Sequence, residues 1–395
     1  MASLAHVLAD WAADLAPTPD DLALADRALL DTVAVAVAAR EHPVTRLAAD
    51  LPDSARWSAA AHVLDFDDLH MASTTHVSAV CVPATLACGG GARAYLAGAG
   101  VMARLGMALG WPHYSAGWHA TCTAGAPAAA VAAGIALGLE AEQLATAMAL
   151  AVPAAGGVQH AFGTDAKSLQ VGFAVEAGVR AARLAAGGAT ADAAALSQWF
   201  RLVGGSSGGP HLGGAAVPGG LAIKLFPCCY ALQRPISALA ELTSGGIDPA
   251  AVSRVVLRTP RVTVAPLIHH RPQTGLQAKF SIEYAVATAL LDARQGFASF
   301  TDEAVRRPEA RRLIDLVEVE LSEGGDWLLA GEFEAEVQVG GEVLRGHLQL
   351  PPGSPERPPT AAELAAKVGD CLAGADVDPS AITWSGAADI LRRWF

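Results

Sequence analysis

The chain has 395 residues, of which 52% are hydrophobic and 17% are charged. This length and composition exclude an intrinsically disordered protein and allow one or two domains with large cores. The formal net charge of −12 argues against a nucleic-acid-binding surface, and an anionic ligand would need a local concentration of positive charge.

The N-terminal segment and the cysteines predict a cytoplasmic protein. Residues 1–20 lack a basic start, and Asp10 and Asp14 interrupt the apolar residues, so the segment does not fit a secretory signal. The cysteines have no CxxC spacing and suggest neither zinc nor a disulfide framework. Residues 120–139 carry no charge, but they are mainly Ala, Gly and Thr, which gain little from lipid. We therefore expect a core helix there rather than a membrane span.

Helical patterns dominate the first 200 residues. Thr18, Pro19, Asp20 and Asp21 supply an N-cap, a proline at the first helical position and acids in the first turn of a helix that runs through Val37. Further helices are predicted at about 77–88, 92–109, 121–138, 140–152 and 166–186. Almost nothing before residue 200 has the alternation of a strand.

The pattern changes after the glycine-rich segment 204–220, which predicts a loop or hinge. Strand patterns follow at 252–258 and 316–321, with a helix at 279–293 between them. Residues 334–350 predict a hairpin that turns at Gly340 and Gly341, and a last helix is expected at 360–373. The order indicates a helical domain, a smaller α+β domain and a helical tail that could rejoin the first.

The densest polar cluster lies at 65–70, with Asp65, Asp67, Asp68 and His70, and His76 follows six residues later. Three interpretations fit these side chains. They could cap a helix end in solvent, they could bind a metal ion, or an aspartate could hold a histidine that acts as a general base. The residues alone do not separate the last two.

Lysine is rare in this chain, since only Lys167, Lys224, Lys279 and Lys367 occur among 27 basic residues. Lys167 lies in the turn that opens a predicted helix, and Lys224 follows the glycine-rich segment. A lysine is a compact charge suited to a carboxylate in a tight pocket, although either could instead form a surface salt bridge. His119 precedes the most apolar helix, where it could form a core hydrogen bond or help hold an anion.

Seven motifs in order along the chain together resemble the MmgE/PrpD family. They are LLDT at 29–32, HVLDFDD at 62–68 with His76, GWHATCTAG at 117–125, GLEAEQLATAMALA at 138–151, GTDAKSLQVG at 163–172, IKLFPCC at 223–229 and AKFSIEYAVATALL at 278–291. Each motif is weak alone, and the ordered set is specific.

The resemblance implies a mainly α fold, with a large all-helical domain formed by both chain ends (1–220 and 356–395). A smaller inserted α+β lid domain (221–355) would face it across the active site. It also implies a homodimer, no metal and no organic cofactor, while the charge and composition described above lead us to expect neither nucleic acid nor membrane as a partner. By motif position, the implied catalytic residues are His76, Asp65 and Tyr284. The substrate-binding set is Lys167, Lys224, His119 and Asp68. Gln233 stands where many members carry a histidine.

The family's reactions predict a cofactor-independent lyase that forms a carbanion alpha to a carboxylate of a di- or tricarboxylic acid. Loss of hydroxide would make it a hydro-lyase, which we favour at this point. Loss of carbon dioxide would make it a decarboxylase of a cis-aconitate-like acid, and return of a proton an epimerase of an iminodisuccinate-like acid. A metal-dependent hydrolase built on the Asp/His cluster is the alternative from another class, and a carboxylate-binding protein without catalysis is a third.

Overall fold

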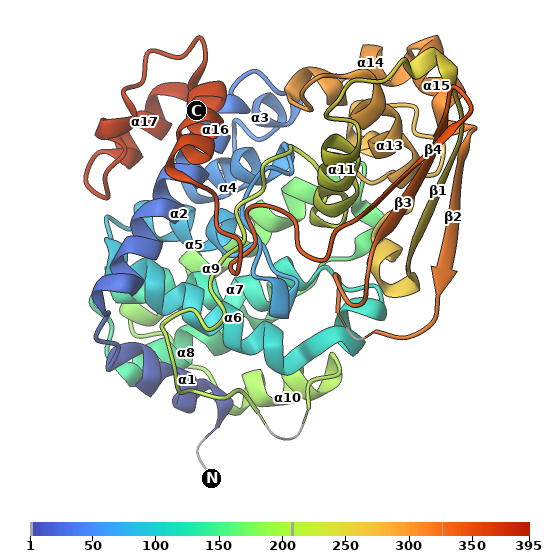
Figure 1. Ribbon diagram of the computed structural model, residues 1–395. Coiled ribbons are helices and arrows are strands. Elements are labelled where there is room, and N and C mark those ends of the chain that lie inside the picture. The colour runs from blue at the N-terminus through green and yellow to red at the C-terminus, as the bar shows by residue number, and fades with distance from the viewer. Residues whose placement is uncertain (1–2, 207–208, 326) are drawn as a thin grey trace. The chain divides into compact units, whose positions relative to one another are not determined.

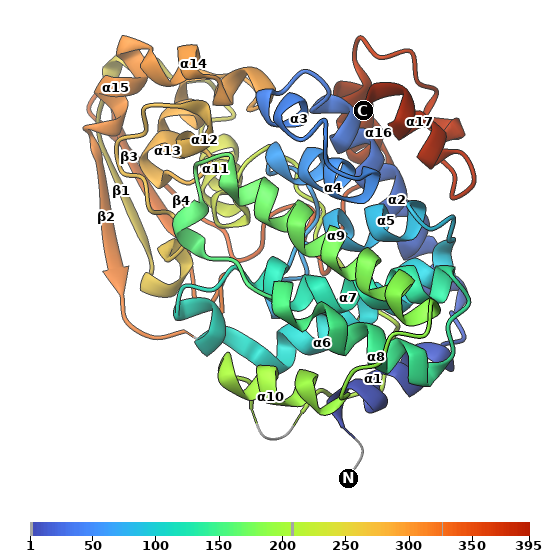
Figure 2. The same cartoon turned by 180° about the vertical axis from the view of Figure 1, so that it is seen from behind.

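The computed structural model describes residues 3–206, 209–325 and 327–395, and the chain divides into two compact units (Figures 1 and 2). Unit 1 comprises Met1–His160, Asp165–Ile223 and Thr360–Phe395, and unit 2 comprises Ala161–Thr164 and Lys224–Pro359. The protein is mainly helical, as predicted. Within the described residues, none of the helices combines the length and the apolar character that crossing a bilayer requires.

Unit 1 is built from helices, and most of them fall where the sequence predicts. The predicted helix that starts at Pro19 forms with a full capping box between Thr18 and Asp21. The described helices of this unit are α1 (Leu4–Ala13), α2 (Pro19–Ala38), α3 (Pro43–Leu47), α4 (Asp53–Val63), α5 (Ser78–Leu86), α6 (Ala92–Ser115), α7 (Ala120–Ala136), α8 (Ala141–Ala151), α9 (Ala166–Ala186), α10 (Ala194–Leu202), α16 (Ala361–Leu372) and α17 (Ala387–Trp394).

The alanine-rich helix α7 is the centre of unit 1. Every residue from Ala120 to Gly134 is buried, which confirms the prediction of a core helix. Small residues allow its neighbours to approach closely. A Cβ atom added at Gly178 of α9 would lie 2.6 Å from both Ala126 O and Ala129 Cβ. The composition that resembles a membrane segment is therefore a requirement of dense helix packing.

Unit 2 contains the α+β part of the chain. Its four-stranded sheet has the order β2-β1-β3-β4, with β1 parallel to β2 and antiparallel to β3. The predicted hairpin is confirmed, since β3 and β4 are joined by Gly340 and Gly341 at φ values of 57° and 87°. Its helices and strands are α11 (Tyr230–Leu242), β1 (Val252–Pro260), α12 (Gly275–Ala278), α13 (Ile282–Leu291), α14 (Asp302–Arg306), α15 (Pro308–Ile314), β2 (Val317–Ser322), β3 (Glu334–Val339) and β4 (Glu342–His347).

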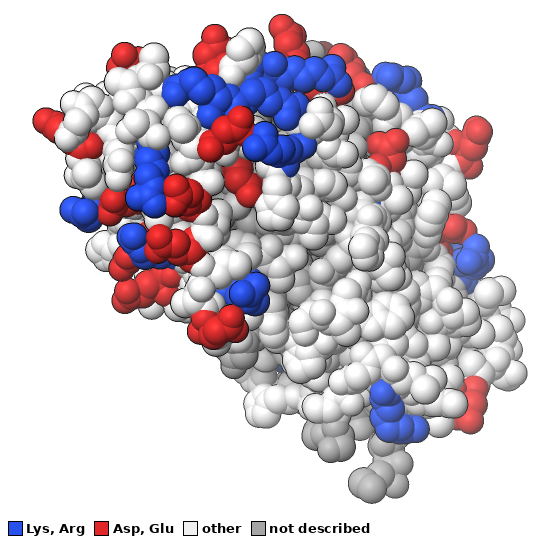
Figure 3. All heavy atoms as spheres, turned by 90° about the vertical axis from the view of Figure 1, so that its right-hand side faces the viewer, with Lys and Arg blue, Asp and Glu red and all other residues white. Residues whose placement is uncertain are grey.

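The exposed charges of this sheet form ion pairs across strands. Arg254 of β1 contacts Glu318 of β2 at 2.6 Å, and Arg258 contacts Glu320 at 2.7 Å. Figure 3 shows basic and acidic side chains intermixed rather than segregated. Such ion pairs place opposite charges side by side on a solvated surface, so the paired charges largely cancel.

The glycine-rich segment 204–220 contains neither helix nor strand in its described residues, while residues 207–208 of that prediction lie outside them. The buried guanidinium of Arg104 holds this segment by donating to backbone carbonyls. The accepting residues of the segment are Leu212, Gly213, Ala215 and Ala216, and Gly100 of α6 accepts a further bond from the same guanidinium. One side chain of α6 therefore orders a loop that has no regular hydrogen-bonding pattern.

Candidate active site

The HVLDFDD motif forms the end of α4 and a tightly fixed loop after it. Asp65 takes a left-handed backbone conformation with φ 53°, which is uncommon for a residue with a side chain. Leu69 then exchanges backbone hydrogen bonds with Ala222, at 2.9 and 2.8 Å. His70 hydrogen-bonds Ser73 and the Pro218 carbonyl through its two ring nitrogens. The loop is thus held from several sides of unit 1.

Two histidines converge on one carboxylate at this loop. Asp67 Oδ2 lies 2.7 Å from His62 Nδ1 and 3.2 Å from His76 Nδ1. The rings of His62 and His76 meet edge to face with centroids 4.7 Å apart. We predicted that Asp65 orients His76, and the structure places the Asp67 carboxylate in contact with that ring.

The shared carboxylate defines the chemistry of both imidazoles. Burial alone would raise the pKa of Asp67. The positive charges that His62 and His76 carry when they are protonated outweigh this effect and hold the pKa of Asp67 well below its usual range. Burial lowers the pKa of His62 to about 4, so this ring is neutral near pH 7. An anionic acceptor at Nδ1 favours the Nδ1–H tautomer, which leaves a lone pair on Nε2. The His76 side chain is 12% exposed whereas His62 is fully buried, so His76 is the candidate base.

Lys167 and His119 lie around the same loop. The Lys167 ammonium, in the first turn of α9, is 3.3 Å from Asp65 Oδ1, and both side chains are buried. His119 caps α7 and stacks on His62 with centroids 5.6 Å apart. Gln170 donates to His119 Nδ1 at 2.6 Å, so the Nε2–H of His119 is a hydrogen-bond donor. Burial first, and then the nearby positive groups, lower the His119 pKa well below its usual range.

Asp68 has partners of a different kind. Its carboxylate accepts the backbone N–H of Ser78 at 3.1 Å and also the Ser78 hydroxyl, which in turn lies 2.8 Å from the Tyr95 hydroxyl. Burial raises the Asp68 pKa to about 7. These contacts fix the first turn of α5, two residues after His76.

Lys224 and Tyr284 belong to unit 2. Lys224 is its first residue after the glycine-rich segment and is buried. Gln233 accepts the backbone N–H groups of Leu225 and Phe226, which gives this departure from the family pattern a structural role. The Tyr284 hydroxyl donates to the Ser299 carbonyl, and burial raises its pKa to about 12, so it is protonated at neutral pH.

The sequence analysis did not single out His62 or Gln170, and both contact predicted site residues. His62 opens the HVLDFDD motif five residues before Asp67, which is not a spacing at which helical side chains pair. Gln170 follows Lys167 by three residues, which places both on one face of α9. Each resembles an ordinary helix residue until its partner is known.

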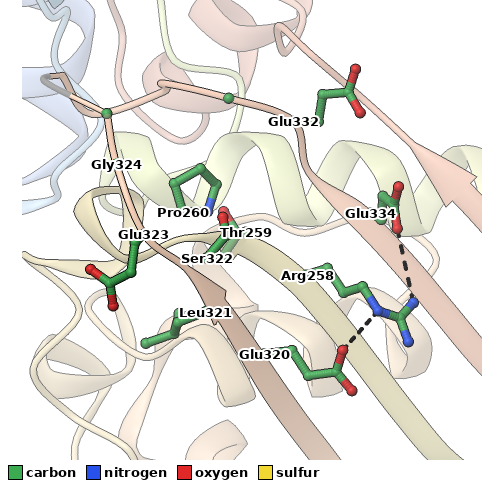
Figure 4. Close-up of a pocket in the computed structure, with 12 residues that line it drawn as sticks. Arg258, Thr259, Pro260, Glu320, Leu321, Ser322, Glu323, Gly324, Glu332 and Glu334 are labelled. Carbon is green, nitrogen blue, oxygen red and sulfur yellow. Dashed lines mark hydrogen bonds and ion pairs between the residues drawn. The ribbon is translucent and has the colours of Figure 1, made fainter.

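A pocket in unit 2 has mainly acidic residues among the charged side chains that line it (Figure 4). It has a volume of about 490 Å³ and is lined by Glu320, Glu323, Glu332 and Glu334 with Arg258. Arg258 contacts Glu320 at 2.7 Å and Glu334 at 3.9 Å. The remaining charge is negative, so this pocket does not suit an anionic substrate.

The donor set at Asp67 also suits a metal ion. One ligand atom from each of His62, Asp67 and His76 lies within 4.8 Å of the others. Two imidazoles and one carboxylate are ligands that first-row divalent metals accept. The same atoms therefore support either a base in contact with a carboxylate or a metal site.

One loop of the helical unit thus carries a carboxylate in contact with two histidines and a buried lysine ion pair, which makes it a candidate acid–base site. Sequence comparison identifies the family. The MmgE/PrpD N-terminal domain matches residues 52–210 and the C-terminal domain matches residues 226–380, and the chain belongs to the MmgE/PrpD family. Two sequences from Aspergillus terreus, one of them from strain NIH 2624, are named cis-aconitate decarboxylase. Each is 27% identical to this chain over 336 residues, which cover 72% of this chain and 67% of the relative.

Proposed function

We propose that this protein is a cofactor-independent lyase that forms a carbanion alpha to a carboxylate of a di- or tricarboxylic acid. The observation that supports this best is the position of His76. Its Nδ1 faces the Asp67 carboxylate, and its ring belongs to the loop that carries the Lys167–Asp65 ion pair. A base held beside a cation is what proton transfer next to a carboxylate requires.

The chemical difficulty is the second negative charge. A carboxylate already carries one charge, and a carbanion beside it needs fixed positive groups or donors in a site with little water. Lys167 supplies an ammonium, and the Nε2–H of His119 supplies a neutral donor. Both side chains are buried, which strengthens their interaction with a bound anion.

Loss of water and loss of carbon dioxide each place an electron pair on carbon that the same groups could stabilise, and return of a proton to the opposite face would make the protein an epimerase. In dehydration, His76 Nε2 takes the proton from carbon, the C–O bond of the β-hydroxyl breaks, and an acid such as Tyr284 protonates the departing oxygen. In decarboxylation, the bond to the carboxylate carbon breaks, its electron pair stays on the alpha carbon, carbon dioxide leaves, and protonated His76 donates to that carbon. The sequence analysis favoured loss of water, while the name of the Aspergillus relatives favours testing loss of carbon dioxide first.

Lys224 follows closely in the chain on Ala222, a residue of unit 1 that is bound to the aspartate loop. Ala222 is hydrogen-bonded to Leu69, four residues after Asp65. Lys224 follows Ala222 by two residues, so the covalent chain alone keeps the Cα atoms of Ala222 and Lys224 within about 7 Å of each other. We propose Lys224 as a second cation for the substrate, as its position in the IKLFPCC motif implies.

A product-resolved assay tests the proposal. Purified protein is incubated with a panel of di- and tricarboxylic acids that includes cis-aconitate, and carbon dioxide and the organic product are measured. We expect turnover of at least one acid and its loss in His76→Ala, with the fold and ligand binding retained. Turnover by His76→Ala at a near-normal rate would remove His76 from the mechanism.

The donor set of His62, Asp67 and His76 favours one alternative, a metal-dependent hydrolase. Dialysis against a strong chelator, followed by metal analysis and assay, separates the two functions. The proposed lyase keeps full activity in metal-free protein, whereas the hydrolase loses activity and regains it with the divalent ion. A protein that only binds carboxylates would bind the acids without converting any of them.

A further inference from the structure

All four lysines of the chain are buried, and two of them are not assigned to the substrate. Lys167, Lys224, Lys279 and Lys367 are each at most 6% exposed. Lys279 donates to the Pro227 carbonyl and Lys367 donates to the Phe66 carbonyl. Both acceptors lie inside motifs that carry proposed site residues, IKLFPCC and HVLDFDD.

Lys367 makes the more telling set of contacts. It lies on α16, in the part of the chain that follows unit 2, and its ammonium is 2.6 Å from Asp31 Oδ1 of α2. The same ammonium donates to Phe66 O at 2.8 Å and lies 4.1 Å from the centroid of the Phe66 ring. A cation with one carboxylate, one carbonyl and one aromatic face as partners is fixed in three directions.

The Phe66 carbonyl belongs to the peptide group between Phe66 and Asp67, and Phe66 itself stands between the two aspartates of the site. On one side is Asp65, with its left-handed backbone and its ion pair to Lys167. On the other side is Asp67, which contacts His62 and His76. Fixing this carbonyl sets the plane of the 66–67 peptide and so the direction from which the Asp67 side chain leaves the backbone.

We propose that Lys367, paired with Asp31, is a positioning residue that holds the 65–68 loop so that Asp67 meets His76. Helix α16 of the C-terminal segment then takes part in organising the active site as well as in the stability of unit 1. This inference rests on the proposed function for its kinetic consequence, but its structural consequence at Asp67 is measurable without any substrate.

The buried ion pair limits which variants are informative. Removing Lys367 alone would leave Asp31 as an uncompensated buried charge and would destabilise the whole unit. The double variant Lys367→Met/Asp31→Asn removes both charges and keeps similar volumes. Lys367→Arg keeps the charge, but its planar donors cannot reproduce the contacts of a compact ammonium in a closed space.

A control variant is available in the turn that follows α2. Arg40, two residues after the end of α2, donates to the carbonyl of Ala373, the C-cap residue of α16, at 3.1 Å. Arg40→Met therefore loosens the docking of α16 without touching the 65–68 loop. It separates a general loosening of the C-terminal segment from the loss of the Phe66 anchor.

Two measurements on these variants test the proposal, both well below the lowest unfolding midpoint. The first is steady-state kinetics, where we expect kcat to fall by about 10- to 100-fold in the double variant because small misplacements are costly. KM should change little, and Arg40→Met should keep kcat within about twofold. The second is NMR of protein with ¹⁵N-labelled histidine, where the ring N–H signals of His62 and His76 should shift in the double variant and stay in place in Arg40→Met.

The outcomes separate this inference from the proposed function. Unchanged kcat and unchanged histidine signals in the double variant would overturn the positioning role. If the double variant does not fold, Lys367→Arg decides, and wild-type kcat and signals in that variant would overturn the role equally. Shifted signals in a protein that converts none of the acids would support the positioning role and refute the lyase.

Discussion

The substitution Asp67→Asn tests the arrangement at the active site most sharply. Asp67 Oδ2 is 3.2 Å from His76 Nδ1, and His76 becomes an imidazolium when it takes a proton from carbon. At an effective dielectric constant of about 20, a unit charge pair at that distance is worth about 5 kcal/mol. Asparagine removes the charge and keeps the shape. The expected loss in kcat is therefore about 10³- to 10⁴-fold.

The assay compares Asp67→Asn with Asp65→Asn under the same conditions. Asp65 forms the ion pair with Lys167, so its substitution should act mainly on KM, through the cation that binds the substrate. Circular dichroism and a thermal melt establish that both variants fold. A kcat within tenfold of wild type for Asp67→Asn, or a larger loss in kcat for Asp65→Asn, would refute the assignment of Asp67 as the partner of His76.

Three further predictions follow from the contacts. Lys167→Met should raise KM by at least about tenfold because one charge-assisted contact is lost, as measured by steady-state kinetics; an unchanged KM would exclude Lys167 from substrate binding. The Asp68 pKa is raised by burial to about 7, above the unfolded value of about 3.9, so its contribution to stability is complete below pH 4 and is lost as pH rises to 7. Asp68→Asn should gain as much as about 4 kcal/mol over wild type between those pH values in urea unfolding, and parallel curves would contradict the raised pKa. Gly178→Val should destabilise unit 1 by about 1–3 kcal/mol or more, because its Cβ position is 2.6 Å from Ala126 O; an unchanged melting temperature would contradict the close packing of α7 and α9.

Much of the helical architecture could be read from the sequence because local signals and burial agree there. The capping box at Thr18 and Asp21 marks the start of α2, and the small-residue pattern of α7 identifies a tightly packed core helix. The predicted helix at 279–293 begins later, at Ile282, because the Ser281 side chain caps it by accepting the Tyr284 N–H. Boundaries of this kind depend on one side-chain hydrogen bond, which periodicity does not reveal.

The loop with three aspartates shows where the sequence stops being informative. Asp65, Asp67 and Asp68 are chemically alike and lie within four positions, yet their partners are Lys167, two histidines and Ser78 respectively. The backbone conformation of Asp65 decides which carboxylate points where, and no pattern of residue types encodes that φ value. The Asp/His cluster was therefore predictable as a site, but the division of roles inside it was not.

The scarcity of lysine identified unusual residues, but it did not reveal what each lysine contacts. Its scarcity pointed to Lys167 and Lys224 as unusual residues, and the structure places all four lysines in buried positions. One partner of Lys367 is a backbone carbonyl 301 positions earlier in the chain. A contact of that kind arises from tertiary packing alone.

Exchange of carbon-bound hydrogen with deuterated solvent tests the central claim most directly. Any carbanion that is protonated in deuterium oxide acquires deuterium on carbon, whether a proton or carbon dioxide was lost to form it. The protein is incubated in deuterium oxide with candidate acids and their products, and deuterium at the carbon beside the carboxylate is followed by NMR. The account predicts incorporation with the wild-type protein and none with His76→Ala. A folded wild-type protein that binds the acids but exchanges no hydrogen, or equal incorporation by His76→Ala, would contradict it.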